Sequence, residues 1–525
     1  MSIYRNVLKK NISRLLALYN LDPGARTYGY GDRLYWGWKI SDFPNGTIQG
    51  GVHALSIALK LGILNNEKFI LKTIDAVINA ISRIRAKNGS MLEAYPGEQS
   101  FCVTALVAFD VLSAIQHLKN YLSQSQIQNY LEIIKPLIGF IERNNEEHAI
   151  ISNHLATAAA ACFLWSKLTE EKSKRGQEIL DVIYKYQSKE GWYMEYEGAD
   201  PGYQTLCTYY LFCIYEITED ERLLRSLEKS ASFLRYFTHP DGTIGGLYGS
   251  RNTEVYYPAG IIGMAKVVDD FALISNLLQK GKEINHHILP QSVDFGNFIP
   301  LLNSYAVAAL KYEQRKRNID DIQVTAPYLD KFSKNFKDAG IYFQSTSKYH
   351  AIINYKKGGT IKIFEKKISA IDTEDGGLFG RLASGKRFST QQFDQSIQFD
   401  NLSINSYFYT INERYLSPFS CITIRILSMT LFRSITLGNL FKKYIVKLLM
   451  TGKNKIDGKV TRRFEFLDDK IVVHESIIRP KGCTAISHIG KFRAIHMASS
   501  GYYFPQVERT SEKSKLVEFR FNDDT

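Results

Sequence analysis

Apolar side chains recur at helical spacing through most of the first 313 residues. In the opening segment, Val7, Leu8, Ile12 and Leu15 follow the three-and-four-residue period of a helix with one buried face. Similar segments follow, separated by Asn-Gly, Glu-Gly and Asp-Gly turns that interrupt helices. The pattern predicts about eleven helices, near residues 4–20, 48–63, 67–87, 98–118, 122–144, 149–168, 169–187, 202–217, 218–238, 255–280 and 297–313.

The turns between these helices share one composition. Those beginning at Asn45, Asn88, Glu190 and Asp241 each lead through aromatic and polar residues into an apolar helix. Such turns return roughly every 45 to 55 residues, with one unit skipped, which is typical of stacked helical pairs. Because the loops carry Trp, Tyr, Glu, Asp and Arg, an incomplete α/α toroid with a shared concave site is favoured over a solenoid.

A different period begins after a charged linker at residues 314–335. Residues 349–355 and 360–364 are short β-like runs joined by a Lys-Gly-Gly turn, and further runs follow them. This spacing predicts an antiparallel β-sandwich over residues 336–525. The predicted class is therefore multidomain α and β, with the toroid at 1–313 as the catalytic domain.

Residues 425–455 interrupt the strand pattern. No Asp or Glu occurs between Arg414 and Ile456. A helix here would separate two sets of side chains, Lys442, Lys443 and Lys447 from Phe441, Ile445, Leu448 and Leu449. That arrangement is typical of an interfacial helix attracted to anionic lipid, and the alternative is a core helix or strand pair with a solvated basic edge.

The net charge of +13 over 525 residues favours an anionic partner. No basic arm occurs in the first 310 residues, so we expect acidic polysaccharide or an anionic membrane surface rather than nucleic acid. The six cysteines form no CxxC pair, and the N-terminus has no signal-peptide pattern. These features predict a cytoplasmic protein with peripheral contact at the inner membrane face.

Polar residues gather where the predicted helices begin. Asn153 and His154 open one apolar run, and Tyr203 opens another 50 positions after Asn153. Adjacent helical hairpins would place these residues on one rim of a toroid. Helix capping and a satisfied histidine are the plainer interpretation of Asn153 and His154. Arg251 lies in a third loop, where pairing with a neighbouring Glu is the alternative.

A toroid followed by a β-sandwich, with Asn-His at one helix mouth and Tyr at the next, resembles the heparinase II/III and alginate lyase superfamily of polysaccharide lyases. The resemblance implies that Asn153, with His154, neutralises a uronate carboxylate and that Tyr203 serves as Brønsted acid and base. It also implies a histidine from the sheet domain, for which His350 is the candidate. The family's His-x-His-x-x-Asp segment, which sometimes binds a metal, is reduced here to His350 and the later Asp372 and Asp375. No cofactor is expected, and a divalent metal in the sheet domain is left open.

The chemistry of elimination is consistent with these roles. Removing the poorly acidic C5 proton of a uronate forms an enolate-like anion, which Asn153, His154 and Arg251 could stabilise by donating hydrogen bonds. A tyrosine with an ordinary pKa of ~10 needs nearby cations to act as a base, and Arg251 is the natural source. The loop residues predicted to bind sugar are Trp36, Trp38, His53, Glu93, Trp192, Glu195, Asn252 and Tyr257. Aromatic members of that set would stack on sugar rings, with core packing as the alternative.

Other functions stay open on the same pattern. Carboxylates in the loops, including Glu93 and Glu195, would suit a glycoside hydrolase, whose acid and base lie ~6.5–9.5 Å apart when it inverts configuration. Uronate C5-epimerisation begins with the same proton abstraction as elimination. A non-catalytic glycan-binding protein of a polysaccharide biosynthesis system, acting on a lipid-linked glycan, would also suit the basic charge.

Overall fold

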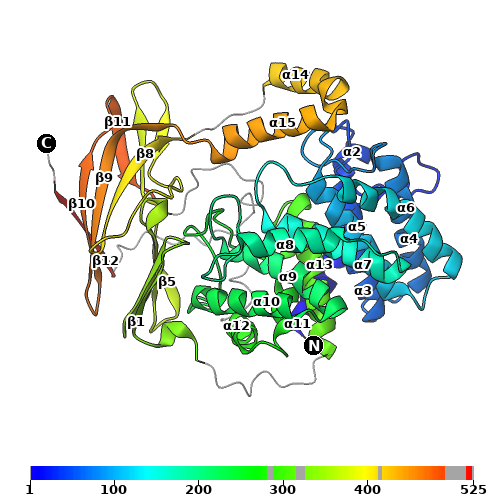
Figure 1. The fold of residues 1–525 in the computed structure, drawn as a ribbon, viewed down its shortest axis with the longest axis horizontal. Helices are drawn as coiled ribbons and strands as arrows, with labels where there is room; N and C mark the ends of the chain where they lie inside the picture. Colours follow the sequence, from blue (N-terminus) through cyan, green and yellow to red (C-terminus); the bar gives the residue numbers. More distant parts are fainter. Residues whose placement is uncertain (1, 281–287, 315–324, 412–416, 491–515, 523–525) are drawn as a thin grey trace.

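Helices fill the N-terminal part of the chain and strands fill most of the rest (Figure 1). The structure is a computed structural model that describes residues 2–280, 288–314, 325–411, 417–490 and 516–522. The predicted helical toroid and sheet domain are both present. Part of the predicted linker, residues 315–324, and positions 491–515 of the predicted sandwich lie outside the described residues.

Within the described residues, six helices form an inner ring and six more pack outside it. The inner helices are α3 (Val52–Lys60), α5 (Phe101–Leu118), α7 (Ser152–Thr169), α9 (Pro201–Thr218), α11 (Pro258–Met264) and α13 (Phe295–Gln314). The outer helices are α1 (Ile3–Leu16), α4 (Glu67–Ile84), α6 (Gln124–Arg143), α8 (Arg175–Tyr186), α10 (Glu221–Leu234) and α12 (Asp269–Lys280). Each inner helix contacts the next, and α13 contacts α3, so the ring closes where the sequence pattern predicted an incomplete one.

Side-chain size and backbone bonds explain how the ring closes. Asn303 of α13 donates from Nδ2 to the Gly50 carbonyl at 3.0 Å and accepts from the Ala54 amide at 3.1 Å. Gly260 permits α11 to approach α9, because a Cβ there would lie 2.6 Å from the Thr208 backbone. Helix α5 is the one described helix that is long and apolar enough to cross a membrane, and 78% of it is buried in the ring.

One predicted helix is divided in the structure. The segment at 255–280 forms α11 and α12, separated by a turn near Ala265. Asp269 and Asp270 occupy the first turn of α12, where acidic side chains favour a new helix N-terminus. Shorter helices connect the long ones: α2 (Arg33–Trp36), η1 (Gly46–Gly51), η2 (Arg235–Phe237), η4 (Pro290–Ser292) and η6 (Pro327–Leu329).

Two sheets face each other in the C-terminal domain. The five-stranded sheet has the order β1 (Phe332–Phe336), β2 (Ile341–Ser345), β3 (Tyr349–Asn354), β4 (Thr360–Glu365) and β5 (Ala370–Asp375). The seven-stranded sheet has the order β11 (Cys483–His488), β6 (Leu378–Leu382), β7 (Arg387–Ser389), β8 (Ser403–Thr410), β9 (Lys455–Phe466), β10 (Ile471–Ile478) and β12 (Val517–Asn522). All pairs are antiparallel except β10 with β12, so the described sheets are mainly antiparallel, as predicted.

The five-stranded sheet is buried on both faces. Ala351 and Ile353 pack with Val473 of the other sheet, whereas Ile352 belongs to the core of the toroid. Phe343 lies 5.1 Å from the Phe237 ring of the toroid, measured between centroids. The alternation of side chains along β3 therefore joins the two domains through one sheet.

The interruption between β8 and β9 forms a pair of helices that lies across the toroid (Figure 1). It consists of α14 (Pro418–Met429), η8 (Leu431–Arg433), α15 (Ile435–Val446) and η9 (Lys447–Thr451). We call residues 418–446 the α14–α15 hairpin. Phe432 and Phe441 pack against Tyr95 of the toroid, at 5.6 and 5.9 Å between ring centroids. The predicted separation of faces is wrong, because Lys442 turns toward the toroid together with Phe441.

A buried ionic cluster joins the strands of the sandwich. Arg462 of β9 contacts Asp375 at 2.8 Å and Glu475 at 2.6 Å. His488 contacts the same two carboxylates, at 3.2 and 2.7 Å. Burial opposes ionisation of Asp375, but Arg462 and His488 outweigh it and lower the pKa of Asp375 to about 2. Burial also opposes ionisation of His488, which acts to lower its pKa. The bonds of His488 to Asp375 and Glu475 outweigh this effect and raise the pKa to about 9.

This cluster predicts a pH window for the stability of the sheet domain. The raised pKa of His488 contributes stability that is complete below its ordinary value of 6.5 and is lost as pH rises through about 9. The lowered pKa of Asp375 contributes stability that is complete above 3.8 and is lost as pH falls through about 2. Thermal unfolding followed by circular dichroism should therefore show both contributions in full between pH 3.8 and pH 6.5, the ordinary pKa values of the two groups.

His488→Phe should remove the decline in stability on the alkaline side. His474→Gln is the matched control, because His474 is partly exposed on β10 and pairs with Glu465 at the surface. An equal alkaline decline in the parent protein and in His488→Phe would contradict the assignment.

Candidate active site

Asn153 holds a buried carboxyl group at the start of α7. Its backbone N–H donates to Glu195 Oε1 at 3.1 Å, and its Nδ2 donates to both carboxyl oxygens, at 3.0 and 2.9 Å. Burial raises the pKa of Glu195 to about 8, although the bonds from Asn153 act in the opposite direction. Glu195 is therefore mainly neutral at pH 7.

Asp200 brings Tyr203 and Arg251 to the same point. It caps α9, accepting from the Tyr203 amide at 3.0 Å through Oδ1, and it accepts from the Arg251 amide at 2.8 Å through Oδ2. Ser250 in turn donates to the Glu195 carbonyl at 3.3 Å. The backbones around Asn153, Tyr203 and Arg251 are thus joined through two buried acids, at the ends of inner helices where the loops meet.

The Arg251 guanidinium faces an aromatic ring in this cluster. Its central carbon lies 3.9 Å from the centroid of Tyr196, a residue held at a φ of +62° in the loop before α9. Burial raises the pKa of the Tyr196 hydroxyl to about 12, even though Arg251 lowers it. Nε of Arg251 is buried and has no hydrogen-bond partner among the described residues. An unsatisfied cationic donor in a polar cluster is a group that an anionic ligand could satisfy.

Glu146 lies between two histidines beside Asn153. Its carboxylate contacts Nδ1 of His148 and Nδ1 of His154, each at 2.8 Å. Burial opposes ionisation of Glu146, but Lys442 and both histidines lower its pKa well below the ordinary value. Burial also lowers the pKa of His154, so the ring is neutral near pH 7 and its Nε2 is the acceptor when Nδ1 donates to Glu146.

Lys442 enters the site from the α14–α15 hairpin. Its Nζ lies 3.2 Å from Glu98 Oε1, and Glu98 and Glu146 raise its pKa against the effect of burial. Glu98 also accepts from the backbone N–H of Glu93, at 3.1 Å. Burial and the charge of Glu98 raise the pKa of Glu93 to about 7. The hairpin thus supplies a cation to the acidic loop that precedes α5.

The structure brings five of the predicted site side chains into this cluster, those of Asn153, His154, Arg251, Glu93 and Glu195, and it places the backbone of Tyr203 beside them. Sequence reasoning missed Glu146, His148, Tyr196 and Lys442. The polar segment before Asn153 was a local signal for the first two. Nothing near Lys442 in the sequence connects it with α5 or α7, since that contact depends on how the hairpin lies on the toroid.

Two of the four predicted sugar-binding aromatics are instead core residues. Trp192 is 4% exposed and donates to Glu190 at 3.3 Å, and Tyr257 is 3% exposed in the inner ring. Trp36 is half-buried and donates to the Leu18 carbonyl at 2.8 Å, whereas Trp38 is 65% exposed. Trp192 and Tyr257 therefore cannot stack on a sugar, because other side chains already cover their faces.

Asn252 and His350 are both buried by contacts within the protein. Asn252 is buried and accepts a hydrogen bond from Nζ of Lys357, which links the toroid to the sheet domain. His350 is fully buried in β3 among Phe332, Phe343 and other aromatic rings. Burial lowers the pKa of His350 to about 3, and neither ring nitrogen has a partner among the described residues. The alternation of β3 directs His350 into the aromatic core, so the predicted catalytic role is not supported.

His53 lies at the opposite end of the ring. Its Nδ1 contacts Asp110 at 3.0 Å, and its ring stacks on His117 at 5.4 Å between centroids. It lines a cavity of about 250 Å³ formed where the inner helices end, together with Cys213 and Lys311. The predicted role in binding sugar at the mouth is therefore wrong for His53.

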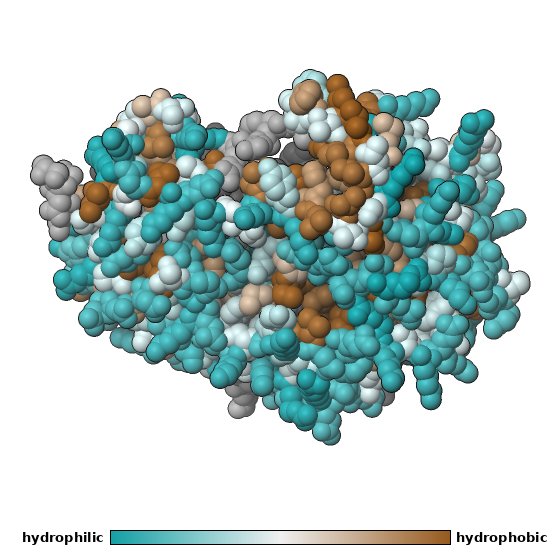
Figure 2. All heavy atoms as spheres, turned by 45° about the horizontal axis from the view of Figure 1, so that its top comes forward, coloured by the Kyte–Doolittle hydropathy of each residue, from teal (hydrophilic) through white to brown (hydrophobic). Residues whose placement is uncertain are grey.

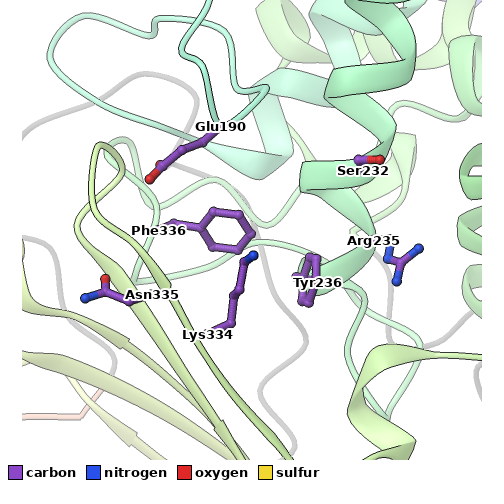
Figure 3. A pocket seen from close by; sticks show the side chains of 7 residues that line it. All are labelled: Glu190, Ser232, Arg235, Tyr236, Lys334, Asn335 and Phe336. Carbon is purple, nitrogen blue, oxygen red and sulfur yellow. The ribbon is translucent and has the colours of Figure 1, made fainter.

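A further cavity of about 460 Å³ lies between α10 and β1 (Figure 3). Two of its charged groups already have partners: Arg235 pairs with Asp270 at 2.9 Å, and Glu190 accepts from the Ala339 amide at 3.0 Å. None of the clustered residues lines this cavity. Among the described residues, no three His, Cys, Asp or Glu side chains are grouped so as to hold a metal ion.

Solved structures share this architecture. A single-substitution variant of chondroitin AC lyase from Streptomyces coelicolor A3 matches 90% of the chain with a TM-score of 0.50 and 10% sequence identity. Xanthan lyase from Paenibacillus matches 78% with a TM-score of 0.49 and 11% identity, and heparinase III matches 78% with a TM-score of 0.49 and 10% identity. The chain spans 44% of the xanthan lyase, 66% of the chondroitin AC lyase variant and 67% of heparinase III.

No family model and no curated protein matches the sequence. The chain thus shares its toroid-plus-sheet fold with the chondroitin AC lyase variant, and a sequence identity of 10% supports a likeness of fold alone.

Proposed function

We propose that this chain is a carbohydrate-active enzyme that cleaves an acidic, uronate-containing polysaccharide by β-elimination. The observation that carries the proposal is that one end of the toroid brings together Asn153 on Glu195, the backbones of Tyr203 and Arg251 on Asp200, and His154 on Glu146. In this proposal Tyr203 exchanges protons with the sugar, while the surrounding donors bind the uronate carboxylate.

Cationic donors support recognition of an anionic sugar. Arg251 has a buried Nε without a partner among the described residues, and Lys442 extends into the same end of the toroid from the hairpin. During elimination, charge moves from C5 onto the carboxylate of the uronate. Donors fixed at that carboxylate stabilise the transition state more than the ground state, which is what accelerates the reaction.

The protonation of Glu195 is compatible with an acidic substrate. An ionised carboxylate beside Asn153 would repel a uronate, whereas the raised pKa of about 8 keeps Glu195 mainly neutral at pH 7. Its bonds to Asn153 also fix the orientation of that amide. We therefore assign Glu195 the task of positioning Asn153 without adding charge.

An assay on uronate polymers tests the proposal. Elimination leaves a conjugated double bond, so ultraviolet absorbance should rise together with new reducing ends. New reducing ends without absorbance would indicate hydrolysis. Exchange of the C5 hydrogen with solvent, without cleavage, would indicate epimerisation, which the same proton abstraction permits.

Glycoside hydrolysis is the second candidate, and one observation favours it. Glu195 has a raised pKa and Glu146 a lowered one, which is the division between acid and base that hydrolases use. Under this reading, Glu195 would protonate the leaving group while Glu146 activated water.

Substitution of Glu195 separates the two candidates. Under the lyase proposal, Glu195→Gln keeps a neutral side chain on Asn153, so the rate of elimination should fall less than about tenfold. If Glu195 is a general acid, the same change should cost about 10² to 10⁴ in rate. Glu197→Gln is the control, because Glu197 pairs with Lys453 at 3.0 Å near the surface. A loss in the larger range would favour the hydrolase.

The partners follow from the same proposal. The net charge of +13 and the cations of the site favour acidic polysaccharide, either free or as a lipid-linked glycan. A cytoplasmic protein at the inner membrane face would meet the lipid-linked form. A glycan-binding protein without catalysis is the outcome expected if uronate polymers bind but remain intact.

A further inference from the structure

The outer face of the α14–α15 hairpin exposes large apolar side chains. Figure 2 shows brown atoms gathered on this part of the molecule, at the top of the view. The exposed apolar residues are Phe419 (79%), Ile422 (59%), Ile426 (53%), Met429 (54%), Leu431 (48%), Leu437 (42%), Leu440 (56%) and Tyr444 (60%). A continuous apolar surface of this kind marks an interaction site on a water-soluble fold.

The inner face of the hairpin is held to the toroid by polar contacts. Arg425 pairs with Asp42, Lys442 pairs with Glu98 at 3.2 Å, and Lys443 pairs with Glu147 at 3.4 Å. Gln99 also donates to the Phe432 carbonyl at 2.6 Å. Because these contacts hold the inner face against the toroid, the apolar outer face stays exposed on the surface of the molecule.

Two threonines on and next to α14 bond to the backbone of that helix. Thr423 donates to the Phe419 carbonyl at 2.9 Å, and Thr430 donates to the Ile426 carbonyl at 2.9 Å. These side chains therefore offer little directional hydrogen bonding to a partner. A partner protein is usually recognised by such bonds at the rim of an interface, whereas a lipid surface requires none.

The charges around the outer face suit anionic headgroups. The sequence has no Asp or Glu from Tyr415 to Ile456, whereas Arg433 and Lys447 are exposed on the hairpin and just beyond it. Exposed Phe and Tyr side chains with basic neighbours are the composition of helices that lie in the headgroup region of a bilayer. A second copy of this face would instead bring like charges together.

We infer that the α14–α15 hairpin docks into the surface of an anionic lipid bilayer through Phe419, Ile422, Leu440 and their apolar neighbours. Leu440 and Tyr444 lie on the same helix as Lys442, so docking places the end of the toroid that carries the site next to the membrane. Presentation of a membrane-borne glycan to that site rests on the proposed function, whereas docking does not.

Vesicle flotation of the full chain tests this inference. The protein should float with vesicles of phosphatidylcholine and phosphatidylglycerol, float less with phosphatidylcholine alone, and lose binding to the anionic vesicles as salt rises. The variant Phe419→Gln, Ile422→Gln, Leu440→Gln should reduce binding at least tenfold. Gln keeps a good helix propensity, so the variant should retain the thermal midpoint of the parent protein.

The matched control is Leu329→Gln with Ile478→Gln, which removes apolar side chains that are 63% and 60% exposed elsewhere. This control and Tyr203→Phe should float like the parent, so that failure of docking and failure of catalysis are seen separately. Equal flotation of the hairpin variant and the parent would overturn the inference. So would absence of binding to anionic vesicles, or a dimer in solution that the hairpin variant dissociates without any binding to vesicles.

Discussion

Tyr203→Phe should lower the rate of uronate elimination by about 10² to 10⁴, the range expected when a general acid–base group is removed. The change deletes one oxygen from a half-buried side chain whose backbone is held by Asp200 at 3.0 Å. The capping bond uses the backbone amide and survives the substitution, so the fold should be unaffected. The measurement is the initial rate at which ultraviolet absorbance rises with a uronate polymer that the parent protein cleaves, at saturating and at low substrate concentration.

Tyr215→Phe is the matched control for this prediction. Tyr215 lies on the same helix, is similarly half-buried and is distant from Asp200 along α9. Its substitution should leave the rate near that of the parent protein. If both variants keep full activity, Tyr203 carries no proton in the reaction and the proposed mechanism is incorrect.

Arg462→Met should destabilise the sheet domain by about 3 to 5 kcal/mol, the range measured when one partner of a buried ion pair is removed. Arg462 is fully buried and contacts Asp375 and Glu475, so its loss leaves two carboxylates without their cation. Met fills much of the volume without replacing the charge. Far-ultraviolet circular dichroism during urea unfolding is the suitable probe, because all four tryptophans lie in the first 192 residues and report on the toroid.

Arg463→Met is the control, because Arg463 is the next residue on β9 and is exposed. It should change the free energy of unfolding by less than about 0.5 kcal/mol, as surface substitutions usually do. A similar small change for Arg462→Met would contradict the view that this cluster stabilises the sandwich.

The toroid and the sheet domain could be predicted because their periods differ. Apolar spacing of three and four residues gives α4 and α10, and the change to short alternating runs gives β3 and β4. The closure of the ring could not be predicted in this way, because it depends on contacts of Asn303 with the backbone near Gly50 and Ala54. Those residues are about 250 positions apart, beyond the reach of any local pattern.

The candidate site was predictable where it lies at helix starts. Asn153 and Tyr203 stand in the first turn of an inner helix and Arg251 stands in the loop before α11, positions that a pattern of helices and turns can indicate. His53 and His350 were misplaced because residue type alone does not give side-chain direction. His53 lies in the first turn of α3, but its side chain lines the cavity formed where the inner helices end, and the alternation of β3 turns His350 into aromatic packing.

The central claim is that Tyr203 and its neighbours perform β-elimination, and the masses of the products test it most directly. A panel of uronate polymers is digested, and the fragments are analysed by mass spectrometry. Elimination predicts that each cleavage produces one fragment lighter by one water molecule than its saturated equivalent, and that Tyr203→Phe forms such fragments about 10² to 10⁴ times more slowly. Fragments that all retain the added water would contradict the claim.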